Sequence, residues 1–421
     1  MKKISKISNL RLMERNFEDS ITYYLLISMA CLNFTNRGRI VLLAWGLFAL
    51  ARYMLCNRLR FTIGSGIALF LSFAVLLPSC ISLDAFDFVT AISSLNFFLT
   101  YYIGFNAYAV ASDKKKFIQN TVFSLFIGFS VYILAIYFYN LYEGTFTPNS
   151  LHFVESFVDA GGRDVKDIWA SDKLSPTFVA VLCSVAIGYS FYAFFCSTKK
   201  TLKLFSAFVL AVVFLMNFST ATRTPILLFV LVYAFMLVLM FIDSDRKKGF
   251  YILAALLAFA LLLFAFYTYD VFGLKTFIDE SPLLDRFANE GIKTTRLEIA
   301  KAYFEYMLEY PWGGGNIAYK VHITAHNFLQ EGYDLYGVFA AIAILIITIV
   351  MIVNVIKLTI IKKKQPVDYL LLGMYVALLA QCMVEPVFES FPILFWCLLL
   401  VHGMATAYCK DREKPAESDQ T

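Results

Sequence analysis

The sequence carries little charge for its length. Only 16% of the 421 residues are charged, whereas a soluble domain has about 25%. Hydrophobic residues make up 60%, above the roughly 45–50% of soluble domains. This composition excludes an ordinary soluble domain and is typical of a membrane protein. The net charge of +5 does not indicate nucleic-acid binding, because the basic residues follow the loops as they do in membrane proteins.

Several other features are missing from the sequence. The eight cysteines form no CxxC pair, so the sequence predicts neither a disulfide framework nor a zinc site. Residues 1–19 are basic but lack a small-residue cleavage site, which predicts a cytoplasmic tail and not a signal peptide. No fixed-period repeat or low-complexity linker divides the chain. We therefore expect one membrane domain over 20–408, followed by a cytoplasmic tail over 409–421.

Long apolar runs fill most of the chain. Runs of about twenty apolar residues, separated by short charged loops, predict an all-α polytopic membrane protein with about twelve transmembrane helices. The expected spans are 20–36, 40–56, 61–83, 89–111, 118–142, 176–197, 203–221, 224–242, 250–270, 335–356, 367–385 and 391–408.

The charges in the loops predict the orientation of these spans. Most Lys and Arg residues gather at both termini and at every second loop, which places both termini in the cytoplasm by the positive-inside rule. Arg37 and Arg39 are exceptions, because they fall on the outer side. Two long loops, about 143–175 and 271–334, then face the extracytoplasmic side. That side also holds most of the acidic residues, among them Asp84, Asp87, Glu385 and Glu389.

The polar stretch from Thr294 to Gly337 is the strongest candidate for function. A loop that carries ionisable groups above an apolar scaffold is a usual place for a binding or catalytic site. Thr294 or Thr295 can cap a helix, and apolar residues follow at helical spacing until Pro311, which predicts an amphipathic helix along the outer membrane surface. The residues expected on its apolar face are Leu297, Ala300, Phe304 and Met307.

Two arginines are candidate anion ligands. Arg223 lies in a short outward turn rich in hydroxyl residues, where a guanidinium could bind phosphate oxygens or simply reach the lipid headgroups. Arg296 lies in the first turn of the predicted surface helix, whose N-terminus also favours an anion. The alternative for Arg296 is an ordinary surface ion pair with Glu298 or Glu290.

His326 is the candidate general base, because imidazole titrates near neutral pH; the alternative is a structural histidine. His322 would share a face with His326 if the segment were helical, but a metal site lacks an obvious third ligand, so we predict no metal. Within the spans, Arg52 is the main charged residue. Ion-coupled carriers usually hold charge inside the membrane, and its near absence argues against a proton- or sodium-driven carrier.

Three motifs resemble those of the bacterial O-antigen ligase and O-antigen polymerase superfamily. The segment Ser219-Thr-Ala-Thr-Arg223-Thr-Pro-Ile-Leu-Leu resembles the family's arginine at the start of an apolar helix. Thr295-Arg296-Leu297 followed by Tyr310-Pro-Trp-Gly-Gly-Gly315 resembles its loop arginine and Pro-x-Gly-x-Gly turn. Ala325-His326-Asn327, nine residues and then Gly337 resembles the ligase signature, with Ala340 in place of its second glycine.

The resemblance implies a C-type glycosyltransferase fold in the bacterial inner membrane with a periplasmic active site. Such enzymes move a glycan from undecaprenyl pyrophosphate to an acceptor hydroxyl without a cofactor or metal. The expected partners are the lipid-linked glycan donor, a lipid A-core or lipid-linked glycan acceptor, and membrane lipids, with no nucleic acid. The implied catalytic residues are His326, Arg223 and Arg296, and the implied substrate-binding residues are Asn327, Gly313 and Gly315.

The resemblance leaves the acceptor open. The leading interpretation is an O-antigen ligase that uses lipid A-core. The alternative is an O-antigen, capsule or exopolysaccharide polymerase that uses a lipid-linked repeat unit, and a distant alternative is a lipid or glycan transporter. Arg37 and Arg39 are further candidates for donor phosphates or an acidic acceptor, against a plain headgroup contact.

Overall fold

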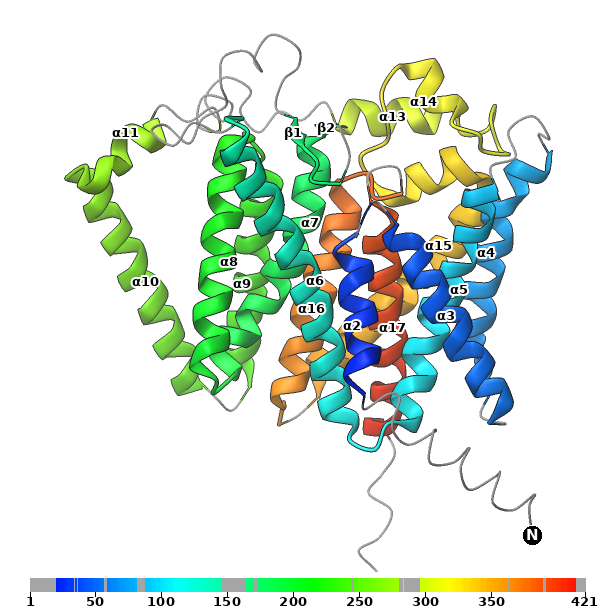
Figure 1. The fold of residues 1–421 in the computed structure, drawn as a ribbon, viewed down its shortest axis with the longest axis horizontal. Helices are drawn as coiled ribbons and strands as arrows, with labels where there is room; N and C mark the ends of the chain where they lie inside the picture. Colours follow the sequence, from blue (N-terminus) through cyan, green and yellow to red (C-terminus); the bar gives the residue numbers. More distant parts are fainter. Residues whose placement is uncertain are drawn as a thin grey trace, which may run out of the picture. The chain divides into compact units, whose positions relative to one another are not determined.

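The chain is an all-α polytopic membrane protein (Figure 1). The computed structural model describes residues 20–33, 35, 37–56, 59–81, 88–145, 164–169, 173–243, 246–279, 283, 296–361, 363–388 and 391–413. Much of the predicted loop over 143–175, a large part of the loop over 271–334, the tail over 1–19, and the acidic residues Asp84, Asp87 and Glu389 lie outside these residues.

Every predicted span overlaps a helix, the shortest of which, α2, has 11 residues. The helices of the first half are α2 (Ile21–Cys31), α3 (Gly38–Leu55), α4 (Ile63–Ile81), α5 (Phe88–Val110), α6 (Lys114–Tyr142), α7 (Pro176–Phe191, continued by a π-turn over Tyr192–Cys196) and α8 (Lys200–Ser219). Those of the second half are α9 (Thr224–Ile242), α10 (Arg246–Thr268), α15 (Phe328–Ile360), α16 (Pro366–Val384) and α17 (Pro392–Glu413). Of the helices in the described ranges, nine are long and apolar enough to cross a membrane.

Short elements lie between the long helices. They are β1 (Val165–Lys166), β2 (Lys173–Leu174), a 3₁₀ turn (Val271–Gly273), α11 (Leu274–Asp279), α13 (Arg296–Tyr306) and α14 (Asn316–Val321). The two strands pair antiparallel, with Val165 opposite Leu174. Several boundaries differ from the sequence prediction. Among them, α15 begins at Phe328, before the expected residue 335, α17 continues to Glu413, past residue 408, and α2 ends at Cys31, before residue 36.

The helices gather into two compact units that are interleaved along the chain. The first unit contains Met1–Gly128, Glu298–Ile360 and Cys382–Thr421, and the second contains Phe129–Leu297 and Ile361–Gln381. Because each unit is assembled from separated stretches, no linker in the sequence marks the division.

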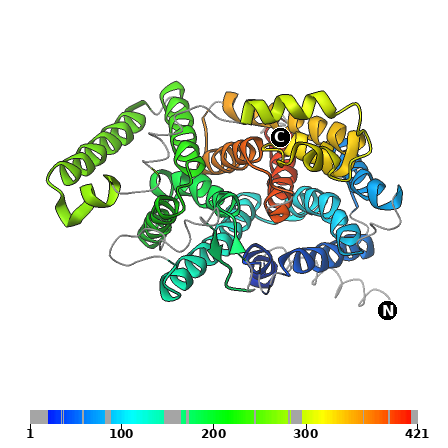
Figure 2. The same ribbon diagram turned by 90° about the horizontal axis from the view of Figure 1, so that it is seen from above.

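In the first unit, α5 packs closely against α17. A Cβ atom on Gly104 would lie 2.3 Å from the carbonyl oxygen of Leu400, and one on Gly403 would lie 2.2 Å from that of Tyr101. Small residues that let helix backbones approach are typical of membrane helix contacts. At one end of this unit α13 and α14 lie across the long helices (Figure 1), and Figure 2 shows them beside the start of α15.

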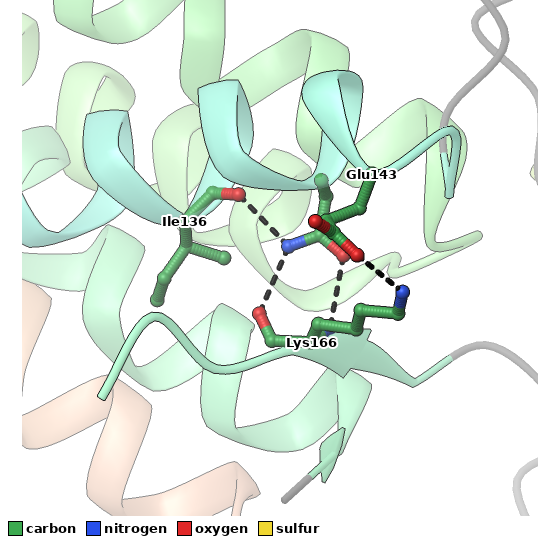
Figure 3. A network of polar contacts seen from close by, with 4 residues as sticks. Ile136, Glu143 and Lys166 are labelled. Atoms are coloured by element: carbon green, nitrogen blue, oxygen red, sulfur yellow. Dashed lines mark hydrogen bonds and ion pairs between the residues drawn. The ribbon is translucent and has the colours of Figure 1, made fainter. Parts of the chain in front are cut away.

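In the second unit, polar contacts attach the short hairpin to the end of α6. Asn140 donates to the carbonyl oxygens of Ile136 and Lys166 at 2.8 and 2.9 Å and accepts from the Lys166 N–H at 2.8 Å (Figure 3). Glu143 accepts from the Lys166 side chain at 2.8 Å and raises the pKa of that lysine. These contacts hold the described part of the loop over 143–175 against α6.

Candidate active site

The N-terminal end of α15 is fixed by Asn327. The Asn327 Oδ1 accepts the Gln330 backbone N–H at 2.9 Å, and its Nδ2 donates to the Gln330 Oε1 at 2.6 Å. This reciprocal pairing of the N-cap residue with the residue three positions on satisfies a backbone donor at the helix start. The Gln330 Nε2 also donates to the carbonyl oxygen of Ala300 on α13 at 3.0 Å. His326 is thereby held directly before the N-cap residue of α15.

A break at Gly337 divides α15 into a short segment (Phe328–Tyr336) and a long one. Gly337 has φ 82° and ψ −177°, which lies outside the helical region. This backbone conformation is adopted essentially by glycine alone. The glycine turn (Pro311–Gly315) pairs with the backbone groups that the break leaves free. The Gly314 and Gly315 N–H groups donate to the carbonyl oxygens of Leu335 and Asp334 at 3.0 and 2.8 Å. The Val338 N–H group donates to the carbonyl oxygen of Pro311 at 2.9 Å.

The glycine turn and the break touch through their backbones. A Cβ atom on Gly313 would lie 2.6 Å from the Gly337 nitrogen, and one on Gly337 would lie 2.8 Å from the carbonyl carbon of Trp312. Both distances are shorter than real Cβ contacts, so both positions require glycine. The glycine turn and Gly337, which belong to separate motifs in the sequence, therefore form the two sides of one contact. This contact positions the short segment.

Asp334 on the short segment caps α14. Its carboxylate accepts the backbone N–H groups of Ile317 at 2.8 Å and Ala318 at 3.1 Å, and the Tyr303 hydroxyl at 3.3 Å. Gly315, the N-cap residue of α14, has no side chain to do this, so a buried carboxylate from a distant position supplies the cap. Asp334 thus links α13, α14 and α15.

One face of α13 packs inside the protein. Ile299 and Tyr303 are its buried residues, and they pack with Ile317, Ala325 and Tyr333. Phe304, expected on the apolar face that lies along the membrane surface, is 66% exposed and stays outside this cluster. The face that packs is set by Tyr303, whose hydroxyl reaches Asp334 and the carbonyl oxygen of Ile323. The helix ends at Tyr306, before Pro311.

His326 lies beside a buried carboxylate. The His326 Nδ1 is 3.8 Å from the Glu385 Oε2, and the two side chains are 29% and 4% exposed. The Nδ1 atom itself is buried and has no hydrogen-bond partner among the described residues. The exposed part of the side chain therefore belongs to the rest of the ring, which includes Nε2. The sequence places Glu385 only among the acidic residues expected on the extracytoplasmic side, because nothing in the spacing pairs it with His326.

His322 does not share a helical face with His326. It follows α14 with φ 58°, in the left-handed region, and the segment up to His326 is not helical. No group of three or more His, Cys, Asp or Glu side chains that could hold a metal is found in the described ranges. Nearby, Glu309 accepts a hydrogen bond from Lys320 at 2.7 Å and so raises the pKa of that exposed lysine.

Arg223 occupies the N-cap position of α9, at the end of a buried turn. The hydroxyl groups before it are used locally: Ser219 and Thr220 donate to the carbonyl oxygens of Leu215 and Met216, and Thr220 and Thr222 bond each other at 2.6 Å. The carbonyl oxygens of Met216, Asn217 and Phe218 at the end of α8 also accept backbone N–H groups of the turn. In this structure the hydroxyls therefore bond within the turn. The half-buried Arg223 side chain is left as the anion-binding candidate of the turn.

The remaining predicted residues lie at helix starts. Arg296 begins α13, although its side chain lies outside the described residues. Arg37 is the N-cap residue of α3, Arg39 follows within that helix, and both are exposed. Arg37, Arg39 and His326 belong to the first unit, whereas Arg223 and Arg296 belong to the second.

Comparison with known proteins identifies the central part of the chain. A family model described as O-antigen ligase matches residues 205–339. This range contains Arg223, Arg296, the glycine turn, His326 and Gly337, so the resemblance to the O-antigen ligase and polymerase superfamily is confirmed. No curated protein matches the chain.

Proposed function

We propose that this chain, whose residues 205–339 match a family model described as O-antigen ligase, moves a polysaccharide from undecaprenyl pyrophosphate to a hydroxyl of lipid A-core. The observation that carries the proposal is the position of His326 within the matched range. The imidazole is held at the start of α15 by the Asn327 cap, with Nδ1 buried and the rest of the ring partly exposed. A fixed imidazole that is open on one side suits a general base.

The proposed reaction is a single displacement. The His326 Nε2 takes the proton of the acceptor hydroxyl while the oxygen of that hydroxyl bonds to the anomeric carbon of the donor. The bond from that carbon to the pyrophosphate oxygen breaks, and the electron pair leaves with undecaprenyl pyrophosphate. Arg223 and Arg296 are assigned to the leaving pyrophosphate on the strength of their motifs, because fixed guanidinium groups stabilise the charge that develops there. This chemistry requires no metal.

The location follows from the loop charges. Basic residues at the termini and alternate loops support cytoplasmic termini and an inner-membrane protein with its reaction on the periplasmic face. The His326-Asn327 pair, separated from Gly337 by nine residues, favours the ligase over the polymerase, whose acceptor would be a second lipid-linked repeat unit.

The test is a deletion strain whose surface polysaccharide is separated on a gel. Full-length polymer stranded on its lipid carrier together with bare lipid A-core is the expected result for a ligase. Core that carries a single repeat unit would instead identify a polymerase. A strain with unchanged polysaccharide would remove both assignments.

Complementation with variants tests the base. His326→Ala is expected to lower the transfer rate by about 10²–10⁴-fold, measured as the fraction of core that carries polymer at equal protein level in the membrane. His322→Asn is the matched control, because His322 is exposed and asparagine tolerates its left-handed backbone. A normal ladder with His326→Ala would show that the base is another group.

A further inference from the structure

Glu385 lies in a buried position, where acidic side chains are rare. Its side chain is 4% exposed, in the segment directly after α16. Burying a carboxylate away from water is costly unless it is paired. One group that can carry positive charge beside it is His326, whose Nδ1 lies 3.8 Å from the Glu385 Oε2. That distance suits an ion pair and is longer than a hydrogen bond, as is common in catalytic pairs without substrate.

The short segment of α15 fixes both partners. His326 precedes this segment by two residues, and Glu331 within the segment accepts the backbone N–H groups of Val387 and Phe388 at 2.7 and 3.1 Å. Glu331 is buried, so these bonds tie the Glu385 segment to the helix that positions the histidine. Phe388 adds ring contacts with Tyr336 and Phe395. The spacing between the carboxylate and the imidazole is thus set by the fold.

From this geometry we infer that Glu385 is a positioning residue for His326. Its carboxylate accepts the Nδ1–H of the imidazole, which leaves Nε2 as the atom that takes the proton. It also stabilises the positive charge that the ring gains when the acceptor oxygen attacks, as a carboxylate does behind other catalytic histidines. The proton later leaves the imidazolium for water. This inference rests on the proposed function and adds the group that orients its base.

Comparing the kcat values of two Glu385 variants shows whether the charge or the shape of the side chain matters. Glu385→Asp keeps the charge on a shorter side chain, whereas Glu385→Gln keeps the length and hydrogen-bonding capacity but removes the charge. With purified full-length protein, undecaprenyl-pyrophosphate-linked glycan and lipid A-core, we expect kcat to fall about 10²-fold in Glu385→Gln, with KM within about threefold of wild type. Glu385→Asp is expected to retain at least tenfold more of kcat than Glu385→Gln.

Controls decide what each result means. Glu309→Gln makes the same substitution at an exposed surface pair and is expected to keep wild-type kcat. If Glu385→Gln matches or exceeds Glu385→Asp, or unfolds at a lower temperature than wild type, Glu385 is a structural residue and the inference is wrong. If His326→Ala is inactive while Glu385→Gln has wild-type kcat, this inference fails and the proposed function stands. If His326→Ala itself is active, the assignment of the base fails, and this inference fails with it.

Discussion

The turn that carries Arg223 and the segment that carries His326 are held in opposite ways. Around Arg223, the hydroxyls of Ser219, Thr220 and Thr222 bond to one another and to carbonyls within four residues. Around His326, the contacts join stretches that are far apart in the sequence: Gln330 reaches α13, Glu331 reaches the segment before α17, and the glycine turn reaches Gly337.

This difference shows where each part of the candidate site is sensitive. A turn closed by neighbouring hydroxyls forms whenever its own helices form, and losing one bond changes little elsewhere. A segment assembled from distant contacts depends on each of them, because residues that share one network do not contribute independently. Substitutions around His326 should therefore disturb more of the structure than substitutions around Arg223.

Gly337→Ala should have the largest effect. Alanine would occupy a glycine-only backbone region and would overlap the backbone of Trp312, which together should cost roughly 3 kcal/mol or more. We expect loss of transfer activity and a lower thermal unfolding midpoint in detergent. Gly273→Ala is the matched control: its φ is 71° but nothing lies near its Cβ position, so it should cost only about 1 kcal/mol. Equal midpoints for the two variants would contradict the close contact between the glycine turn and the break.

Asp334→Ala should have an intermediate effect. It removes the acceptor for two backbone N–H groups of α14, a loss of about 1–3 kcal/mol. Hydrogen exchange at Ile317 and Ala318 should accelerate, and activity should fall because α14 precedes the His326 loop. Asp334→Asn keeps one carbonyl oxygen and should lose less. Unchanged exchange at both amides would show that another group caps α14.

Thr220→Val should have the smallest effect. It keeps the shape of the side chain and removes one hydroxyl that bonds within the turn, so stability should change by about 1 kcal/mol. Activity should stay within about threefold of wild type, whereas Arg223→Ala in the same turn should abolish transfer. A loss of activity with Thr220→Val comparable to that of Arg223→Ala would assign the hydroxyl to substrate and not to the turn.

The sequence predicted the helices well, because a span is recorded in consecutive apolar residues. It predicted less well how the helices meet. The face of α13 that packs inside the protein, through Ile299 and Tyr303, was not predicted, because the contact of Tyr303 with Asp334 joins residues that are distant in the sequence. The division into two units was also invisible, since each unit combines separated stretches.

The candidate site shows the same limit. His326, Arg223 and Arg296 were found from short motifs, and the family match covers all three, although their roles stay predictions. Glu385 could not be found in this way, because no local pattern connects it to His326.

The sequence by itself determined that this protein is a polytopic helical membrane protein with a superfamily motif before its last helices, because hydropathy and short motifs are local properties. Only the tertiary structure decided that the glycine turn closes the break at Gly337, that Asp334 caps α14, and that Glu385 lies behind His326. The physical reason is that each of these contacts satisfies a buried backbone or charged group with a partner that the chain supplies from elsewhere.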